Sequence, residues 1–270
     1  MLQRSHRQHL AFSGSSGGSL VASVLASGGN IDSSARVVIA AQPECRWRPW
    51  RMLSKVDSAV ESLIPNDAHM QVSGRLRVLL THVKWGWPPI APLVLDTFDS
   101  TPQLRDALRA SCHIPGLGGL RPKAVHLEPK GVGEAACFDG SVWPSWFCGW
   151  RAFSANDVIV AVSGLSGCLG LLGPPLLVPL HWVVLPPSQE MLWRFYRAGY
   201  QDAERCFGDL GDDVTGSELV EAVGQMLRGR RAACWTVNLN HDLLVPIALG
   251  WVQLLFTIGL FMFALRAAIS

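Results

Sequence analysis

The chain has 270 residues, of which 49% are hydrophobic and only 16% are charged. These figures exclude intrinsic disorder, which requires low hydrophobicity and high charge, and a disulfide-dependent miniature protein, because a chain of this length buries a large core. The formal net charge of +2 also argues against a nucleic-acid partner. Eleven Trp against two Tyr indicate contact with a membrane interface, where Trp is enriched.

Seven cysteines without a C-x-x-C pair predict reduced thiols in a protein that faces the cytosol. The first residues lack the apolar run of a secretory signal, which favours the same compartment. The eight histidines show no metal-binding spacing, so we expect neither a metal ion nor a cofactor.

Along the first half of the chain, the pattern predicts a strand ending near Phe12, a tight turn and a helix that stops at Gly28-Gly29. Residues 36–41 fit either a helix or a strand. The later elements are a helix closed by Pro65, two strands and a helix opened by Thr101-Pro102, at residues 57–64, 75–83, 91–98 and 101–112.

The second half of the chain is more apolar. Residues 156–162 read as a buried strand, and the uncharged stretch that follows fits strand, loop and strand better than a spanning helix. Residues 189–206 read as a helix. Residues 243–265 carry no charged side chain and exceed the ~20 residues that cross a bilayer, so they predict a membrane helix, with a packed core helix as the alternative. Arg228, Arg230 and Arg231 before this segment place the main domain in the cytosol.

A G-x-S-x-G motif at residues 14–18 centres on Ser16. A nucleophilic serine on a strand-to-helix turn needs a strained backbone, and we expect Gly14 and Gly18 to remove side chains that would clash there. The helix that follows points its positive end at a developing anion, for which the Gly17 backbone N–H is a donor. Asp139, followed by Gly140 on a turn after a strand, is a candidate proton acceptor, although an ordinary Asp-Gly turn has the same pattern.

With Ser16 and Asp139, four further blocks resemble the patatin-like phospholipase family, in the branch that contains adipose triglyceride lipase. They are residues 63–69, residues 73–83, the LRDALRASCHIP block at 104–115, and residues 185–188 with 199–203. The resemblance covers roughly residues 12–207. It implies an α/β protein with a three-layer fold and a mostly parallel central sheet, in which Ser16 is the nucleophile and Asp139 the general base. We therefore expect their side chains to lie within hydrogen-bond reach or one water further.

One departure concerns the oxyanion hole. The family has a glycine-rich loop upstream of the nucleophile, whereas only 15 residues precede Ser16. We expect the first strand and this loop to be missing, and activity to be weak as a result. The domains expected are an acyl hydrolase domain at 1–210, a linker at 211–242 and a membrane segment at 243–266.

Two alternatives remain open at this point. His181 and His241 follow Asp139 in the order of a Ser-Asp-His triad, although each also fits a structural role. The basic and aromatic cluster at residues 46–51 fits either an anionic lipid surface or a solvated loop.

The resulting hypothesis is a membrane-attached lipid acyl hydrolase with triacylglycerol or phospholipid as substrate, on a lipid droplet or the endoplasmic reticulum. The alternative is a catalytically impaired protein that binds membrane or lipid without turnover. The sequence identifies no protein activator.

Overall fold

The computed structural model describes residues 11–84, 89–127, 133–140, 182, 185–207, 218 and 221. The chain divides into two units, the first formed by Met1–Ile159 and Pro179–Tyr200 and the second by the rest. Most described residues belong to the first unit. The expected strand at 156–162 and the membrane segment at 243–265 lie outside the described residues, so both stay predictions.

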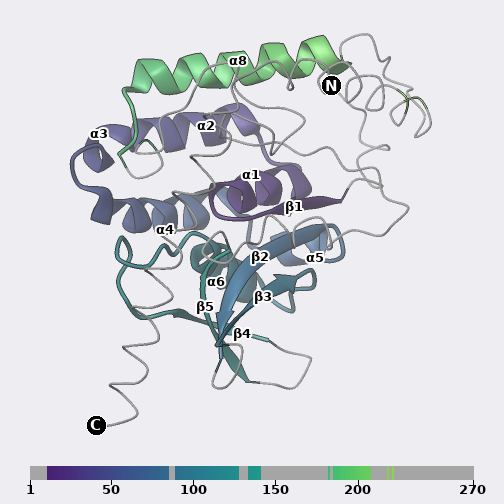
Figure 1. The fold of residues 1–270 in the computed structure, drawn as a ribbon. Coiled ribbons are helices and arrows are strands. Elements are labelled where there is room, and N and C mark those ends of the chain that lie inside the picture. Colours follow the sequence, from purple (N-terminus) through teal and green to yellow (C-terminus); the bar gives the residue numbers. More distant parts are fainter. Residues whose placement is uncertain are drawn as a thin grey trace, which may run out of the picture. The chain divides into compact units, whose positions relative to one another are not determined.

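The described elements of the first unit begin with a short strand and a run of helices, and a set of strands with one further helix follows. In chain order they are β1 (Phe12–Gly14), α1 (Gly17–Ala26), α2 (Ile31–Ala40), α3 (Gln42–Cys45), η2 (Pro49–Arg51), α4 (Met52–Leu63), α5 (Ala68–Val72), β2 (Leu76–Val83), β3 (Ile90–Leu95), α6 (Thr101–Ser111), β4 (Lys123–His126), β5 (Glu134–Asp139) and α8 (Gln189–Phe207), the last of which continues into the second unit. Figure 1 shows their arrangement.

The expected strand, turn and helix around Ser16 are confirmed as β1 and α1. Residues 36–40, within the stretch that fitted a helix or a strand, belong to α2, and Ala41 is its C-cap. The Asn30 side chain caps the start of that helix by accepting from the Ser33 N–H at 2.9 Å. At α6, Ser100 is the capping residue and Pro102 stands in the first turn. Within the described residues, no helix combines the length and the apolar character that crossing a bilayer requires.

The sheet is mixed, and the expectation of a mostly parallel sheet is wrong for its described strands. β1 runs parallel to β2, whereas β2 pairs antiparallel with both β3 and β5, and β4 pairs antiparallel with β5. For β2 and β3 the physical reason is their short connection, which spans only residues 84–89. A parallel pair would need a crossover of about a dozen residues or more.

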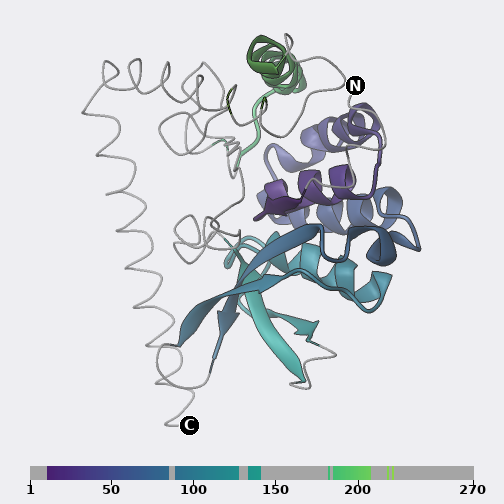
Figure 2. The same cartoon turned by 90° about the vertical axis from the view of Figure 1, so that its right-hand side faces the viewer.

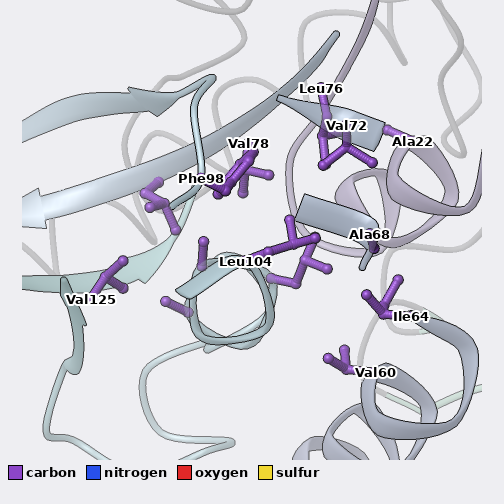
Figure 3. Close-up of a cluster of buried hydrophobic side chains, with 14 of the residues drawn as sticks. Ala22, Val60, Ile64, Ala68, Val72, Leu76, Val78, Phe98, Leu104 and Val125 are labelled. Carbon is purple, nitrogen blue, oxygen red and sulfur yellow. The ribbon is translucent and has the colours of Figure 1, made fainter. Parts of the chain in front are cut away.

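The main core lies between one face of this sheet and helices α1, α4, α5 and α6 (Figures 1 and 2). Alternate residues of β2, namely Leu76, Val78 and Leu80, point to that face because side chains alternate along a strand. Leu104 of α6 is fully buried and lies amid the β2 side chains and Val60 of α4 (Figure 3). α1 and α6 both pack on β2 and touch one another, so the core holds the start of α1 and the end of α6 in fixed positions beside β2.

Candidate functional site

Ser16 occupies a strained turn between β1 and α1. Its backbone has φ 55° and ψ −135°, and it is the non-glycine residue with a positive φ in the part of the chain that the structure describes. Such a conformation costs on the order of 1–3 kcal/mol and persists only where the surroundings enforce it. Ser16 is half-buried, and it stands immediately before the first residue of α1. This is the strand, turn and helix geometry expected of a nucleophilic serine in G-x-S-x-G.

The two outer glycines of the motif have different roles. A Cβ on Gly14 would lie 2.4 Å from the backbone carbon and oxygen of Gly18, so the turn exists only because position 14 lacks a side chain. A Cβ on Gly18 would meet nothing within 4 Å. The expectation that both glycines remove clashing side chains is therefore confirmed for Gly14 and wrong for Gly18, whose backbone is the surface that Gly14 approaches.

Local hydrogen bonds close this turn. The Gly18 N–H donates to the Ser15 carbonyl at 2.9 Å, and the Ser19 N–H donates to the Ser16 carbonyl at 2.9 Å. The Ser19 hydroxyl donates to the same Ser16 carbonyl at 2.7 Å. The Gly17 N–H donates to no acceptor among the described residues, and it stands at the positive end of α1. It is thus suited to the oxyanion role expected of it.

Ser111, which the sequence analysis did not single out, connects the turn to the sheet. Its hydroxyl accepts from the Ser16 N–H at 3.0 Å and donates to the Leu79 carbonyl of β2 at 2.8 Å. The signal that could have found it is its place on α6. It follows Leu104 by seven residues and Leu108 by three, so a fully buried hydroxyl stands on the core-facing side of the helix.

Asp139 is fully buried at the last position of β5. It pairs directly with Leu80, so its side chain points to the sheet face that α1 and α6 cover. Hydrogen bonds fix both the N–H and the carbonyl of its backbone. The N–H donates to the His113 carbonyl at 3.0 Å, and the carbonyl accepts from the Thr81 hydroxyl at 2.8 Å. The carboxylate is thereby held by a rigid strand end.

The ends of β1 and β5 meet beside Leu79. β1 runs parallel to β2 and reaches Val78, while β5 runs antiparallel to β2 and ends opposite Leu80. A Cβ on Gly140 would lie 2.3 Å from the Leu79 carbonyl oxygen and 2.7 Å from the Ser15 hydroxyl. The structure therefore brings the Ser15-Ser16 turn and the Asp139-Gly140 segment together. A hydrogen bond between the Ser16 hydroxyl and the Asp139 carboxylate stays a prediction.

Two side chains fill the space around these segments. Burial, reinforced by the negative charge of Asp139, raises the pKa of the Cys112 thiol, which a hydrogen bond with Ser19 offsets only in part. Cys112 therefore stays a neutral thiol and does not compete as a nucleophile. Burial also favours the neutral form of His113 and so lowers its pKa. The His113 ring stacks on Phe138, and its Nε2 donates to the Arg121 carbonyl at 2.9 Å.

The residues of the alternative triad, His181 and His241, lie outside the described residues, as does Ser141 after Gly140. The described site thus consists of a strained serine at a helix N-terminus and a buried carboxylate on an adjoining strand end. These are components that nucleophilic catalysis uses.

Comparison with known proteins gives one distant similarity. The chain is 23% identical over 218 residues to human omega-hydroxyceramide transacylase, a match that covers 75% of this chain and 40% of that protein. The chain thus spans less than half the length of the curated relative it matches. No family model and no solved structure matches the chain. The similarity supports a lipid-acting enzyme as a distant relative, and nothing finer.

We predict that Gly14→Ala destabilises the protein and that Gly18→Ala does not. The methyl group at position 14 meets backbone atoms of Gly18 and Ser19, which no side-chain rotation can relieve, so we expect a loss of about 1–3 kcal/mol or more. Gly18→Ala has open space in a helix and should be neutral or stabilising. Urea unfolding of both variants measures the difference, and equal midpoints would contradict the proposed reason for the motif.

We also predict that Ser16→Gly is more stable than Ser16→Ala. Both changes remove the hydroxyl, but only glycine adopts φ 55° without strain, so the difference should be about 1 kcal/mol or more. Thermal unfolding of the two variants side by side makes the comparison. A Ser16→Ala protein that melts at or above the Ser16→Gly protein would show that the turn is not strained.

Proposed function

We propose that this chain is a patatin-like lipid acyl hydrolase that cleaves carboxylic esters of glycerolipids through Ser16 and Asp139. The observation that carries the proposal is the strained Ser16 turn, which adjoins the buried strand end bearing Asp139. The distant similarity to a lipid transacylase supports a lipid substrate in general, since that protein is named for acyl transfer involving a ceramide.

The proposed reaction has two halves. In the first, the Ser16 oxygen attacks the ester carbonyl while Asp139 accepts the proton of the Ser16 hydroxyl. The Gly17 N–H donates to the resulting oxyanion. The alcohol leaves with the proton from Asp139, and the acyl group stays on Ser16. In the second, Asp139 takes a proton from water as the hydroxide attacks the acyl carbonyl. The tetrahedral intermediate then releases the fatty acid, and Asp139 returns its proton to the departing Ser16 oxygen, which restores both residues.

The acyl acceptor defines a second candidate function. A lipid hydroxyl in place of water would convert hydrolysis into acyl transfer through the same acyl-enzyme. The name of the relative favours testing this outcome. Both reactions require Ser16 and Asp139, and they differ only in the product that carries the acyl group.

The proposed location is a membrane or lipid-droplet surface on the cytosolic side. It rests on the uncharged segment at residues 243–265 and on the three arginines before it.

We predict that ester turnover by the full chain depends on Ser16 and Asp139. Ser16→Ala should reduce turnover to background, and Asp139→Asn should reduce it about 10²–10⁴-fold, because a general base contributes that much. Asparagine keeps the backbone bonds to His113 and Thr81, so the fold should survive. Release of labelled fatty acid from triacylglycerol and phospholipid, with transfer to an added lipid alcohol followed in parallel, measures both activities.

Ser15→Ala is the matched control. The Ser15 hydroxyl is buried without a hydrogen-bond partner among the described residues, so its removal breaks no described bond and should leave turnover unchanged. Turnover that survives Ser16→Ala but disappears with Ser15→Ala would show that Ser15, and not Ser16, is the nucleophile. An inactive wild-type chain would contradict the proposal and favour the lipid-binding alternative.

A further inference from the structure

The chain passes from α3 through η2 into α4 (Figure 1), and this stretch carries exposed aromatic and basic side chains. Trp47 is 74% exposed and Trp50 is 64% exposed, although large apolar side chains are normally buried. The arginines at positions 46, 48 and 51 are interleaved with them and are also exposed. We call residues 46–51 together with Leu120 the Trp/Arg surface.

Leu120 is included in this surface because its loop reaches the start of α4. A Cβ on Gly118 would lie 2.7 Å from a methyl group of Leu53, which stands one helical turn after Trp50. The loop that carries Leu120 therefore packs against the first turn of α4. Leu120 itself is 73% exposed and follows this contact by two residues.

The charge of the Trp/Arg surface is positive. Glu44, at its edge, pairs with Lys55 at 2.6 Å and with Arg51 at 3.5 Å, so its charge is already compensated. Among the described residues, no carboxylate lies within ion-pair distance of Arg46 or Arg48. The Arg46 guanidinium lies over the Trp47 ring, 5.4 Å from its centroid. A cation with no carboxylate partner among the described residues thus stands directly beside an exposed indole ring.

This combination matches a phospholipid surface with anionic headgroups. Trp side chains favour the boundary between headgroups and acyl chains, and arginines near it attract anionic phosphates. Charge complementarity therefore selects an anionic lipid as the occupant, whereas a protein partner would have to bring both an acidic patch and pockets for the protruding indoles.

The Trp/Arg surface is also tied to the candidate site. The loop from His113 to Arg121 carries Leu120. His113, its first residue, makes a hydrogen bond to the Asp139 strand end and another to the last residue of the loop. The His113 carbonyl accepts from the Asp139 N–H, while its ring Nε2 donates to the Arg121 carbonyl. A lipid surface bound at Leu120 thus lies against the loop whose first residue fixes the Asp139 strand end.

We propose that the Trp/Arg surface docks this protein on phospholipid membranes or monolayers that contain anionic lipids. The proposal rests on the proposed function insofar as the bound surface supplies the lipid substrate.

The test is vesicle flotation of the full chain, with vesicles of phosphatidylcholine alone and vesicles in which phosphatidylserine replaces part of it. We expect tighter binding to the phosphatidylserine vesicles and loss of this difference at high salt. Arg48→Glu should weaken binding to them about tenfold or more, because each basic residue near an anionic surface contributes to affinity. The double change of Trp47 and Trp50 to Ala should weaken binding as well.

Matched controls separate this surface from general effects. Lys84→Glu changes the net charge by the same amount at an exposed position elsewhere, and Met70→Ala removes another exposed apolar side chain, so both should bind like wild type. The segment at residues 243–265 is present in every variant and carries no charge, so it contributes equally to both vesicle types. Circular dichroism of each variant verifies the fold.

Equal binding to both vesicle types, or an Arg48→Glu variant that binds like wild type, would overturn the proposal. A wild-type chain that ignores vesicles altogether would also overturn it and leave a protein partner as the occupant. Ser16→Ala should bind vesicles like wild type. A chain that binds vesicles through this surface but hydrolyses no ester would therefore refute the proposed function alone.

Discussion

The close approach of Gly14 to the backbone of Gly18 is the constraint on which the candidate site depends. It forces the chain to reverse between β1 and α1 within the span of the motif, and Ser16 takes the conformational strain. The strain is maintained by bonds on both sides, since Ser19 closes the turn locally and Ser111 links the Ser16 N–H to β2. The strain at Ser16 destabilises the fold locally, and in return the Ser16 hydroxyl and the first N–H of α1 lie side by side.

β2 organises the rest of the site. β1 and β5 pair with successive parts of this strand from opposite directions, and their ends meet beside Leu79. The Leu79 carbonyl accepts from Ser111 and lies against Gly140, so one peptide group positions the serine turn, the end of α6 and the aspartate segment at once. Burial of Asp139, with the neutral Cys112 thiol nearby, limits the access of water to the carboxylate.

The local elements of this arrangement could be predicted from the sequence, whereas the directions of the strands and the contacts between distant segments could not. Gly14 and Ser16 specify a strand, a turn and a helix because only glycine permits the close approach. The Asp139-Gly140 pair looked like an ordinary turn, whereas the structure shows that Gly140 is needed for contact with β2. Sheet direction is not encoded in an apolar run, although the short link between residues 83 and 90 was a hairpin signal. The helical pattern of α6 could indicate that Ser111 is buried, but its partner Ser16 lies 95 residues away and no local pattern reveals it.

The central claim is that Ser16, rather than a neighbouring serine, is an activated nucleophile, and covalent labelling tests it most directly. The full chain is treated with a fluorophosphonate, and the phosphonylated residue is located by mass spectrometry of the tryptic peptide between Arg7 and Arg36, which also contains Ser13, Ser15 and Ser19. The strained turn predicts that the label is confined to Ser16 and that labelling slows in Asp139→Asn. Label on another serine, or none on native protein, would contradict the account.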